Sequence, residues 1–127
     1  MLRRDINAPN APAPASPYTQ AVEVSGVSRT LYLSGQIPAD ANGTVPDDVE
    51  AQIRLAWANV VAQLNAAGMS LDHLIKVTTI MPDIANLPAS RKIRGEVLGD
   101  RRPGSTLIIG GLANPAWKIE IEAIACA

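Results

Sequence analysis

The sequence predicts a single α+β domain with the element order β-β-α-β-α-β-β, in which two helices cover one sheet. Apolar residues between Val49 and Leu64 recur at helical spacing, and short runs rich in β-branched residues lie on both sides of that segment. Residues 117–125 alternate strictly, with Trp117, Ile119, Ile121, Ala123 and Ala125 on one face and Lys118, Glu120 and Glu122 on the other, as in a strand with one buried face. Such a sheet must bury its apolar face, and two helices can cover it.

The composition fits one globular domain. The chain has 127 residues, of which 47% are hydrophobic, and this length suits a single core. It contains no Phe, two Trp and two Tyr, so the core must be built from Ala, Val, Ile and Leu. Small side chains bury little area each, and we therefore expect burial between subunits to supplement the core.

Charge and cysteine content exclude several classes of protein. The net charge of −1 lacks the basic excess that binds a phosphate backbone, so we expect no nucleic-acid partner. Cys126 is the single cysteine and His73 the single histidine, and their spacing matches no zinc site. No long apolar run indicates a signal peptide or a membrane span, and no membrane partner is expected. We expect a cytoplasmic protein.

The N-terminal third is predicted to be extended. Residues 1–17 form an arm, because repeated Pro among Ala and Asn disfavours a helix. Residues 21–24 and 30–34 are short β-type runs separated by a turn composition, which predicts a hairpin. Gly35 and Pro38 end its second strand.

The following helix is the clearest element of the chain. Asp47 and Glu50 predict a capped helix start, and Gly68 predicts its end. Between them the apolar residues at helical spacing are Val49, Ile53, Trp57, Val60, Val61 and Leu64.

Three strands and a second helix complete the prediction. Residues 74–81 form a strand, and a shorter helix runs over about residues 88–98 with Gly99 closing it. Residues 101–112 and 117–125 contain two further strands joined by a turn.

Carboxylates and a phenol are the first candidates for chemistry. Glu120 and Glu122 share one face of the last strand, where they either act as acid, base or water-positioning groups or form a solvated face with Lys118. Tyr18 follows a Pro in the arm, so its hydroxyl either contacts a ligand or lies on the surface.

Two further groups allow a functional and a structural interpretation. Ser34 and Gly35 either present a hydroxyl and a backbone N–H to a ligand or only form a turn. Arg91, Lys92 and Arg94 on the second helix form either an anion site or a solvated helix face.

Five segments together resemble the Rid (YjgF-type, reactive intermediate deaminase) family. They occur in the family's order between Pro17 and Ala125. In chain order the segments are Pro17-Tyr18-Thr19-Gln20-Ala21, Leu33-Ser34-Gly35-Gln36-Ile37-Pro38, Ala66-Ala67-Gly68-Met69-Ser70-Leu71-Asp72 after a helix with Asn59, Lys76-Val77-Thr78-Thr79, and Ile119-Glu120-Ile121-Glu122-Ala123-Ile124-Ala125.

The resemblance implies a chorismate-mutase-like fold assembled as a homotrimer, with clefts between subunits for a small-molecule substrate. It also implies a cytosolic enzyme without metal or cofactor that hydrolyses reactive imines or enamines to carbonyl compounds and ammonia. Some members have been described as ribonucleases or translation inhibitors, a role that the net charge of this chain does not support.

The resemblance also assigns roles to single residues. Tyr18, Ser34 and Thr106 match positions that line the ligand site, and Glu120 matches the carboxylate that orients the attacking water. One position departs from the family. Gly104 stands where an Arg binds the carboxylate of the substrate.

Three explanations of this departure are open. The first is an imine or enamine substrate that lacks the usual carboxylate or presents it elsewhere, and the second is that Arg91 or Arg102 replaces the missing guanidinium. The third explanation is a non-catalytic trimer that binds or senses a metabolite. We rank a hydrolase with an altered substrate first.

Overall fold

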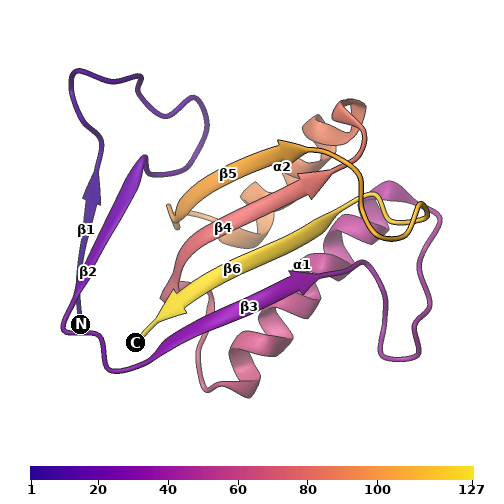
Figure 1. Ribbon diagram of the computed structural model, residues 1–127, viewed down its shortest axis with the longest axis horizontal. Coiled ribbons are helices and arrows are strands. Elements are labelled where there is room, and N and C mark those ends of the chain that lie inside the picture. Colours follow the sequence, from indigo (N-terminus) through magenta and orange to yellow (C-terminus); the bar gives the residue numbers. More distant parts are fainter.

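Two helices pack against one face of a four-stranded sheet in the computed structural model, which describes residues 1–127 (Figure 1). A separate two-stranded hairpin lies beside this sheet. The α+β class predicted from the sequence is confirmed. The helices are α1 (Val49–Ala66) and α2 (Leu87–Leu98), and the strands are β1 (Leu2–Ile6), β2 (Ala21–Ser25), β3 (Thr30–Gln36), β4 (Leu74–Met81), β5 (Gly104–Ile109) and β6 (Glu120–Cys126).

The strand order of the main sheet is β3-β6-β4-β5. β6 is antiparallel to both β3 and β4, whereas β5 is parallel to β4, and α2 forms the connection that a parallel pair requires. The two C-terminal strands therefore do not pair with each other, because β4 lies between them. Both helices cover the same face, and the opposite face of the sheet, which is turned toward the viewer in Figure 1, is left open by them.

The predicted hairpin between residues 21–24 and 30–34 is wrong. β2 pairs with β1 instead, with Leu2 opposite Ser25, so the N-terminal arm contains a strand that the sequence did not predict. Local pattern identifies a strand but not its partner, and the charged run in β1 conceals its own strand character. Arg3 attaches the hairpin to the body through hydrogen bonds from Nη1 to the Leu74 carbonyl (3.1 Å) and from Nη2 to the Arg102 carbonyl (2.8 Å).

Helix α1 begins one residue later than predicted. The N-cap is Asp48 rather than Asp47, because the Asp48 carboxylate accepts a hydrogen bond from the Ala51 N–H at 2.9 Å. The C-terminal end agrees with the prediction. Gly68 has a φ of +70°, which a glycine adopts without strain, and the following N–H of Met69 bonds the Leu64 carbonyl at 2.8 Å.

The core lies between the two helices and the sheet. The strict alternation predicted for the last strand is confirmed, since Ile121, Ala123 and Ala125 are buried under the helices while Glu122 is exposed on the open face. Burying one Ile side chain of this kind contributes about 1.5–3 kcal/mol. Neither helix combines the length and hydrophobicity that a membrane-spanning segment requires.

Two exposed ion pairs join the helices to each other. Lys92 of α2 contacts Glu50 of α1 at 2.9 Å, and Arg54 of α1 contacts Glu96 of α2 at 2.7 Å. The hydrogen bond from Arg54 lowers the pKa of the Glu96 carboxyl. Both pairs are open to solvent, so they orient the helices more than they stabilise them.

The buried amide of Gln52 links α1 to two loops. Its Nε2 donates to the carbonyls of Pro46 (2.8 Å) and Ala116 (3.0 Å), and its Oε1 accepts from the Lys118 N–H at 2.8 Å. Gln52 is 2% exposed, so its amide depends on these partners instead of water. Gln52 thereby holds the loop before β6 against the helix.

We predict that Gln52→Ala lowers the free energy of unfolding by about 1–3 kcal/mol, since three partly buried hydrogen bonds between the helix and two loops are lost. Urea denaturation at fixed protein concentration measures the change. The matched control is Gln63→Ala in the same helix, whose exposed amide makes one long hydrogen bond of 3.4 Å to Gln36 and whose loss should cost less than about 0.5 kcal/mol. Equal effects of the two substitutions would contradict this role of Gln52.

Candidate functional site

A polar cavity of about 170 Å³ opens at the β5 edge of the sheet, between β5, α2 and the loop that precedes β2. The long β1–β2 loop supplies one wall, α2 supplies the second and β5 the third. The polar groups of the wall are Ser16, Tyr18, Ser90, Arg91, Arg94 and Ser105. Leu87 and Leu107 add apolar surface beside them. The cavity therefore offers several hydrogen-bond donors and two positive charges to a small ligand.

Arg94 is the most constrained of these side chains. Its Nη1 donates to Ser105 Oγ at 3.0 Å and its Nη2 donates to Ser16 Oγ at 3.2 Å. Burial lowers the pKa of the Arg94 guanidinium, and the neighbouring charges of Arg91 and Arg102 lower it further. Arg94 is thus a partly buried cation whose hydrogen-bond partners within the chain are neutral.

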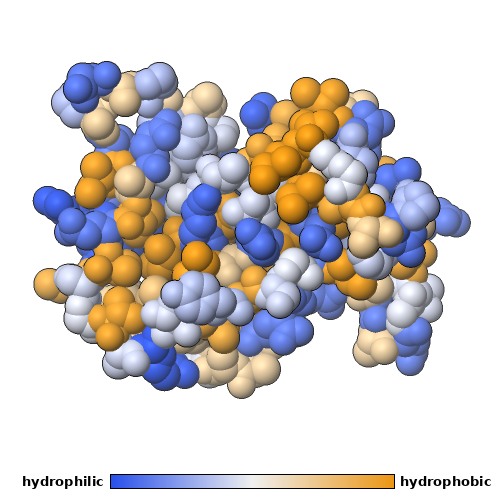
Figure 2. Space-filling view, in the orientation of Figure 1, coloured by the Kyte–Doolittle hydropathy of each residue, from blue (hydrophilic) through white to orange (hydrophobic).

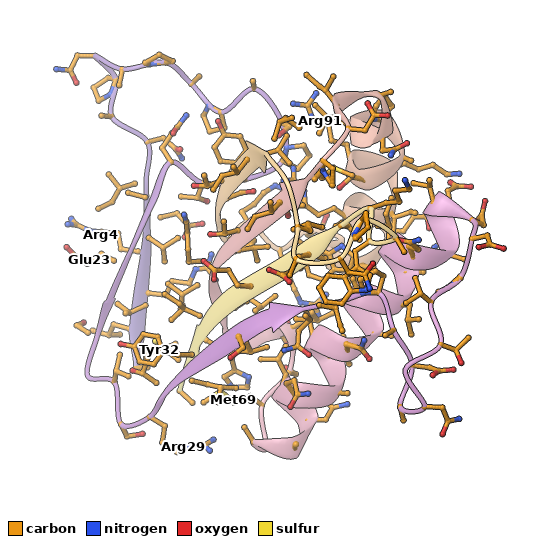
Figure 3. All side chains as sticks on the ribbon, turned by 45° about the vertical axis from the view of Figure 1, so that its right-hand side comes forward. Arg4, Glu23, Arg29, Tyr32, Met69 and Arg91 are labelled. Atoms are coloured by element: carbon orange, nitrogen blue, oxygen red, sulfur yellow. The ribbon has the colours of Figure 1, made fainter.

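The sequence proposed Arg91 or Arg102 as a replacement for the family's arginine, and the two lie in different surroundings. Arg91 lines the cavity, and it projects from α2 as an exposed side chain (Figure 3). Arg102 does not line the cavity, and its Nη1 donates to the carbonyls of Gly99 (2.9 Å) and Arg101 (3.0 Å).

Sequence reasoning grouped Arg94 with its helix neighbours and did not single it out. The spacing of Arg91 and Arg94 could have identified it, because residues three apart lie on the same face of a helix. Lys92 points elsewhere and pairs with Glu50. The positions of Ser16 and Ser105 at this face depend on tertiary structure and carried no comparable signal.

Gly104 and Thr106 face away from the cavity. Gly104 is buried opposite Lys76 in the β4–β5 register, and a Cβ built on it would lie 3.3 Å from Lys76 Cδ. Thr106 shares this face, where its Oγ1 accepts a hydrogen bond from Lys76 Nζ at 2.7 Å. Ser105, between them, lines the cavity together with Leu107.

Ser34, Gly35 and Glu120 form a second cluster on the open face of the sheet. A Cβ built on Gly35 would lie 2.6 Å from the carboxyl carbon of Glu120, so only a glycine leaves room for this carboxylate. The Glu120 carboxylate makes no hydrogen bond within the chain, although it is only partly exposed. A single chain does not bring Glu120 to the cavity that contains Tyr18 and Arg91.

The comparison with known proteins explains the pattern of motifs. The profile of the family described as Endoribonuclease L-PSP matches residues 8–127. The chain belongs to the Rid (YjgF/RutC) family. A 2-iminobutanoate/2-iminopropanoate deaminase of Capra hircus is 33% identical over 127 residues, covering 98% of this chain and 90% of the relative.

Two other Rid relatives extend the comparison. The crystal structure of the Rid family protein YyfB from Yersinia pestis, a protein of unknown function, superposes with a TM-score of 0.85 at 32% identity and covers 100% of both chains. The mitochondrial protein mmf2 of Schizosaccharomyces pombe is 36% identical over 112 residues, which is 86% of each chain. Since Rid relatives include a mitochondrial protein, the cytoplasmic localisation of this chain stays a prediction.

We predict that Gly35→Ala displaces the Glu120 carboxylate while the fold persists, because the atoms in the way belong to the end of a flexible side chain. The expected loss of stability is about 1–2 kcal/mol, with a shift of the Glu120 carboxyl ¹³C resonance in NMR spectra. Gly110→Ala is the matched control, because its Cβ would meet only Ile108 Cγ2 at 3.8 Å. An unchanged Glu120 resonance in Gly35→Ala would show that Gly35 does not position the carboxylate.

Proposed function

We propose that this Rid protein hydrolyses a reactive imine or enamine to a carbonyl compound and ammonia. The observation that carries the proposal is the Glu120 carboxylate, which lies against Gly35 without a hydrogen-bond partner in the chain. A carboxylate in this state can accept a proton from water and orient the water's oxygen. The similarity to the Capra hircus deaminase over nearly the whole chain supports this chemistry.

The proposed reaction needs only water as co-reactant, and no metal or cofactor is part of it. An enamine first becomes the imine by moving a proton from nitrogen to carbon. The oxygen of water then adds to the imine carbon, while Glu120 takes a proton from the water and passes it to the nitrogen. The C–N bond breaks, ammonia leaves with its electron pair and a proton from the new hydroxyl, and the C=O bond forms.

The complete site is proposed to form between two copies of the chain in a homotrimer. One copy would contribute Tyr18 and the arginines of the cavity, and the other would contribute Ser34, Gly35 and Glu120 from its open sheet face. That face carries exposed apolar residues, including Tyr32 at 75% exposure and Ile108 at 45%. Figure 2 shows apolar side chains gathered over the end of β5. Large exposed apolar side chains of this kind support an assembly that covers them.

The substrate expected from the sequence differs from the usual 2-imino acids because of Gly104. Thr106, which was expected at the ligand, lies on the same face as Gly104 and bonds Lys76. The arginines at the cavity instead favour an anionic substrate, so the structure supports the explanation in which another arginine replaces the missing one, and carboxylated imines are the substrates to test.

We predict that the protein accelerates ammonia release from 2-iminopropanoate or 2-aminoacrylate generated in situ, and that Glu120→Gln lowers kcat/KM by about 10²–10⁴-fold. The amide keeps the shape of the side chain and loses its basicity. Glu122→Gln is the matched control, because Glu122 occupies the same strand and the same face. The kcat/KM of Glu122→Gln for ammonia release should equal that of the unmodified protein.

A different result would support the alternative function. Saturable binding of a small metabolite without any turnover, unchanged in Glu120→Gln, is the behaviour of a non-catalytic binding or sensing trimer. Equal rate losses in Glu120→Gln and Glu122→Gln would contradict the specific role of Glu120.

A further inference from the structure

The two arginines at the cavity have no acidic partner in the chain. The five ion pairs of the protein use Arg3, Arg4, Arg54, Lys92 and Arg101, and none of them includes Arg91 or Arg94. The contrast is sharpest within α2, where Lys92 points away from the cavity and is paired with Glu50. Within α2, the basic side chain that points away from the cavity is thus neutralised, while Arg91 and Arg94 at the cavity are left as uncompensated positive charge.

This arrangement costs stability in the absence of a ligand. A guanidinium keeps its charge at every physiological pH, and withdrawing a charge from water is unfavourable unless an opposite charge compensates it. Arg94 is partly buried, and Arg91 and Arg102 add repulsion instead of compensation. An anion in the cavity would remove this cost.

The hydrogen bonds of Arg94 orient it for such an anion. Ser105 and Ser16 hold one N–H of each terminal nitrogen, which leaves three of the five guanidinium donors for a ligand. A planar fork with free donors matches a carboxylate in a bidentate manner. The cavity volume of about 170 Å³ gives room for a small organic anion.

We propose that Arg94, assisted by Arg91, binds the carboxylate of the substrate from helix α2. Arg94 would then determine specificity for small anionic substrates, in place of an arginine on β5. Leu87 and Leu107 would contact the short apolar chain of the same molecule. The proposal rests on the proposed function, because it assigns the anion site to the substrate of the imine hydrolase.

Binding measurements test the anion site without relying on catalysis. Isothermal titration calorimetry compares 2-oxobutanoate with its neutral amide, 2-oxobutanamide, on the full chain. We expect the unmodified protein to prefer the anion, and Arg94→Gln to weaken binding of the anion by about 10–100-fold while binding of the amide is unchanged. The affinity of Arg94→Lys for 2-oxobutanoate should lie between those of the unmodified protein and Arg94→Gln, because lysine keeps the charge and loses the planar fork.

Lys92→Gln is the matched control, since it removes one positive charge two residues away on the same helix. It should leave binding of 2-oxobutanoate within about twofold of the unmodified protein, because its exposed charge is screened. Arg94→Gln should melt no lower than the unmodified protein when no ligand is present, because it removes an uncompensated charge.

Several results would overturn the proposal. The first is that the unmodified protein binds 2-oxobutanoate and its amide equally tightly. The second is that Arg94→Gln leaves the affinity for 2-oxobutanoate unchanged, or that Lys92→Gln lowers that affinity as much as Arg94→Gln does. The third is that the unmodified protein binds inorganic phosphate more tightly than 2-oxobutanoate. Ammonia release at the same kcat/KM in Arg94→Gln would reject the anion site and leave the proposed function intact. Binding of 2-oxobutanoate that depends on Arg94, without ammonia release, would reject the proposed function and support the anion site.

Discussion

The alternation of side chains along the strands is the constraint on which the rest of the structure depends. Because successive residues of β6 point to opposite faces, Ile121 and Ala123 must lie under the helices when Glu120 and Glu122 lie on the open face. The same rule separates Ser105 from its neighbours on β5. It distributes the candidate site over two faces of the sheet, so that a second copy is required to complete it under the proposed function.

The parallel pairing of β4 and β5 explains the position of the arginines. A parallel pair needs a crossover connection, and α2 provides it by packing over the sheet between the two strands. The crossover brings the face of α2 that carries Arg91 and Arg94 beside Ser105. A positive charge on this helix thus reaches the strand on which the family's arginine is expected, without an arginine in the strand itself.

The N-terminal segment completes the cavity wall. Arg3 binds backbone carbonyls at the start of β4 and before β5, and the N–H of Thr19 bonds the Pro103 carbonyl at 3.3 Å. These contacts fasten both ends of the segment that contains Ser16 and Tyr18. Without these contacts, the loss of conformational entropy would disfavour an ordered loop at the edge of the sheet.

Local patterns in the sequence determined the α+β class, the approximate extent of the two helices, the strand at 74–81, the last strand apart from its start, which lies at Glu120 instead of Trp117, and the family, because these depend on periodicity, caps and motif order. They also determined that Glu120 and Glu122 share a face of the last strand and that Gly35 lies at the end of an earlier strand. Tertiary structure alone decided that β2 pairs with β1, that β4 separates the two last strands, and that Arg94 meets Ser16 and Ser105. Those outcomes join residues far apart in the chain, and a pattern read over neighbouring residues contains no information about which distant partner a strand edge or a guanidinium will meet.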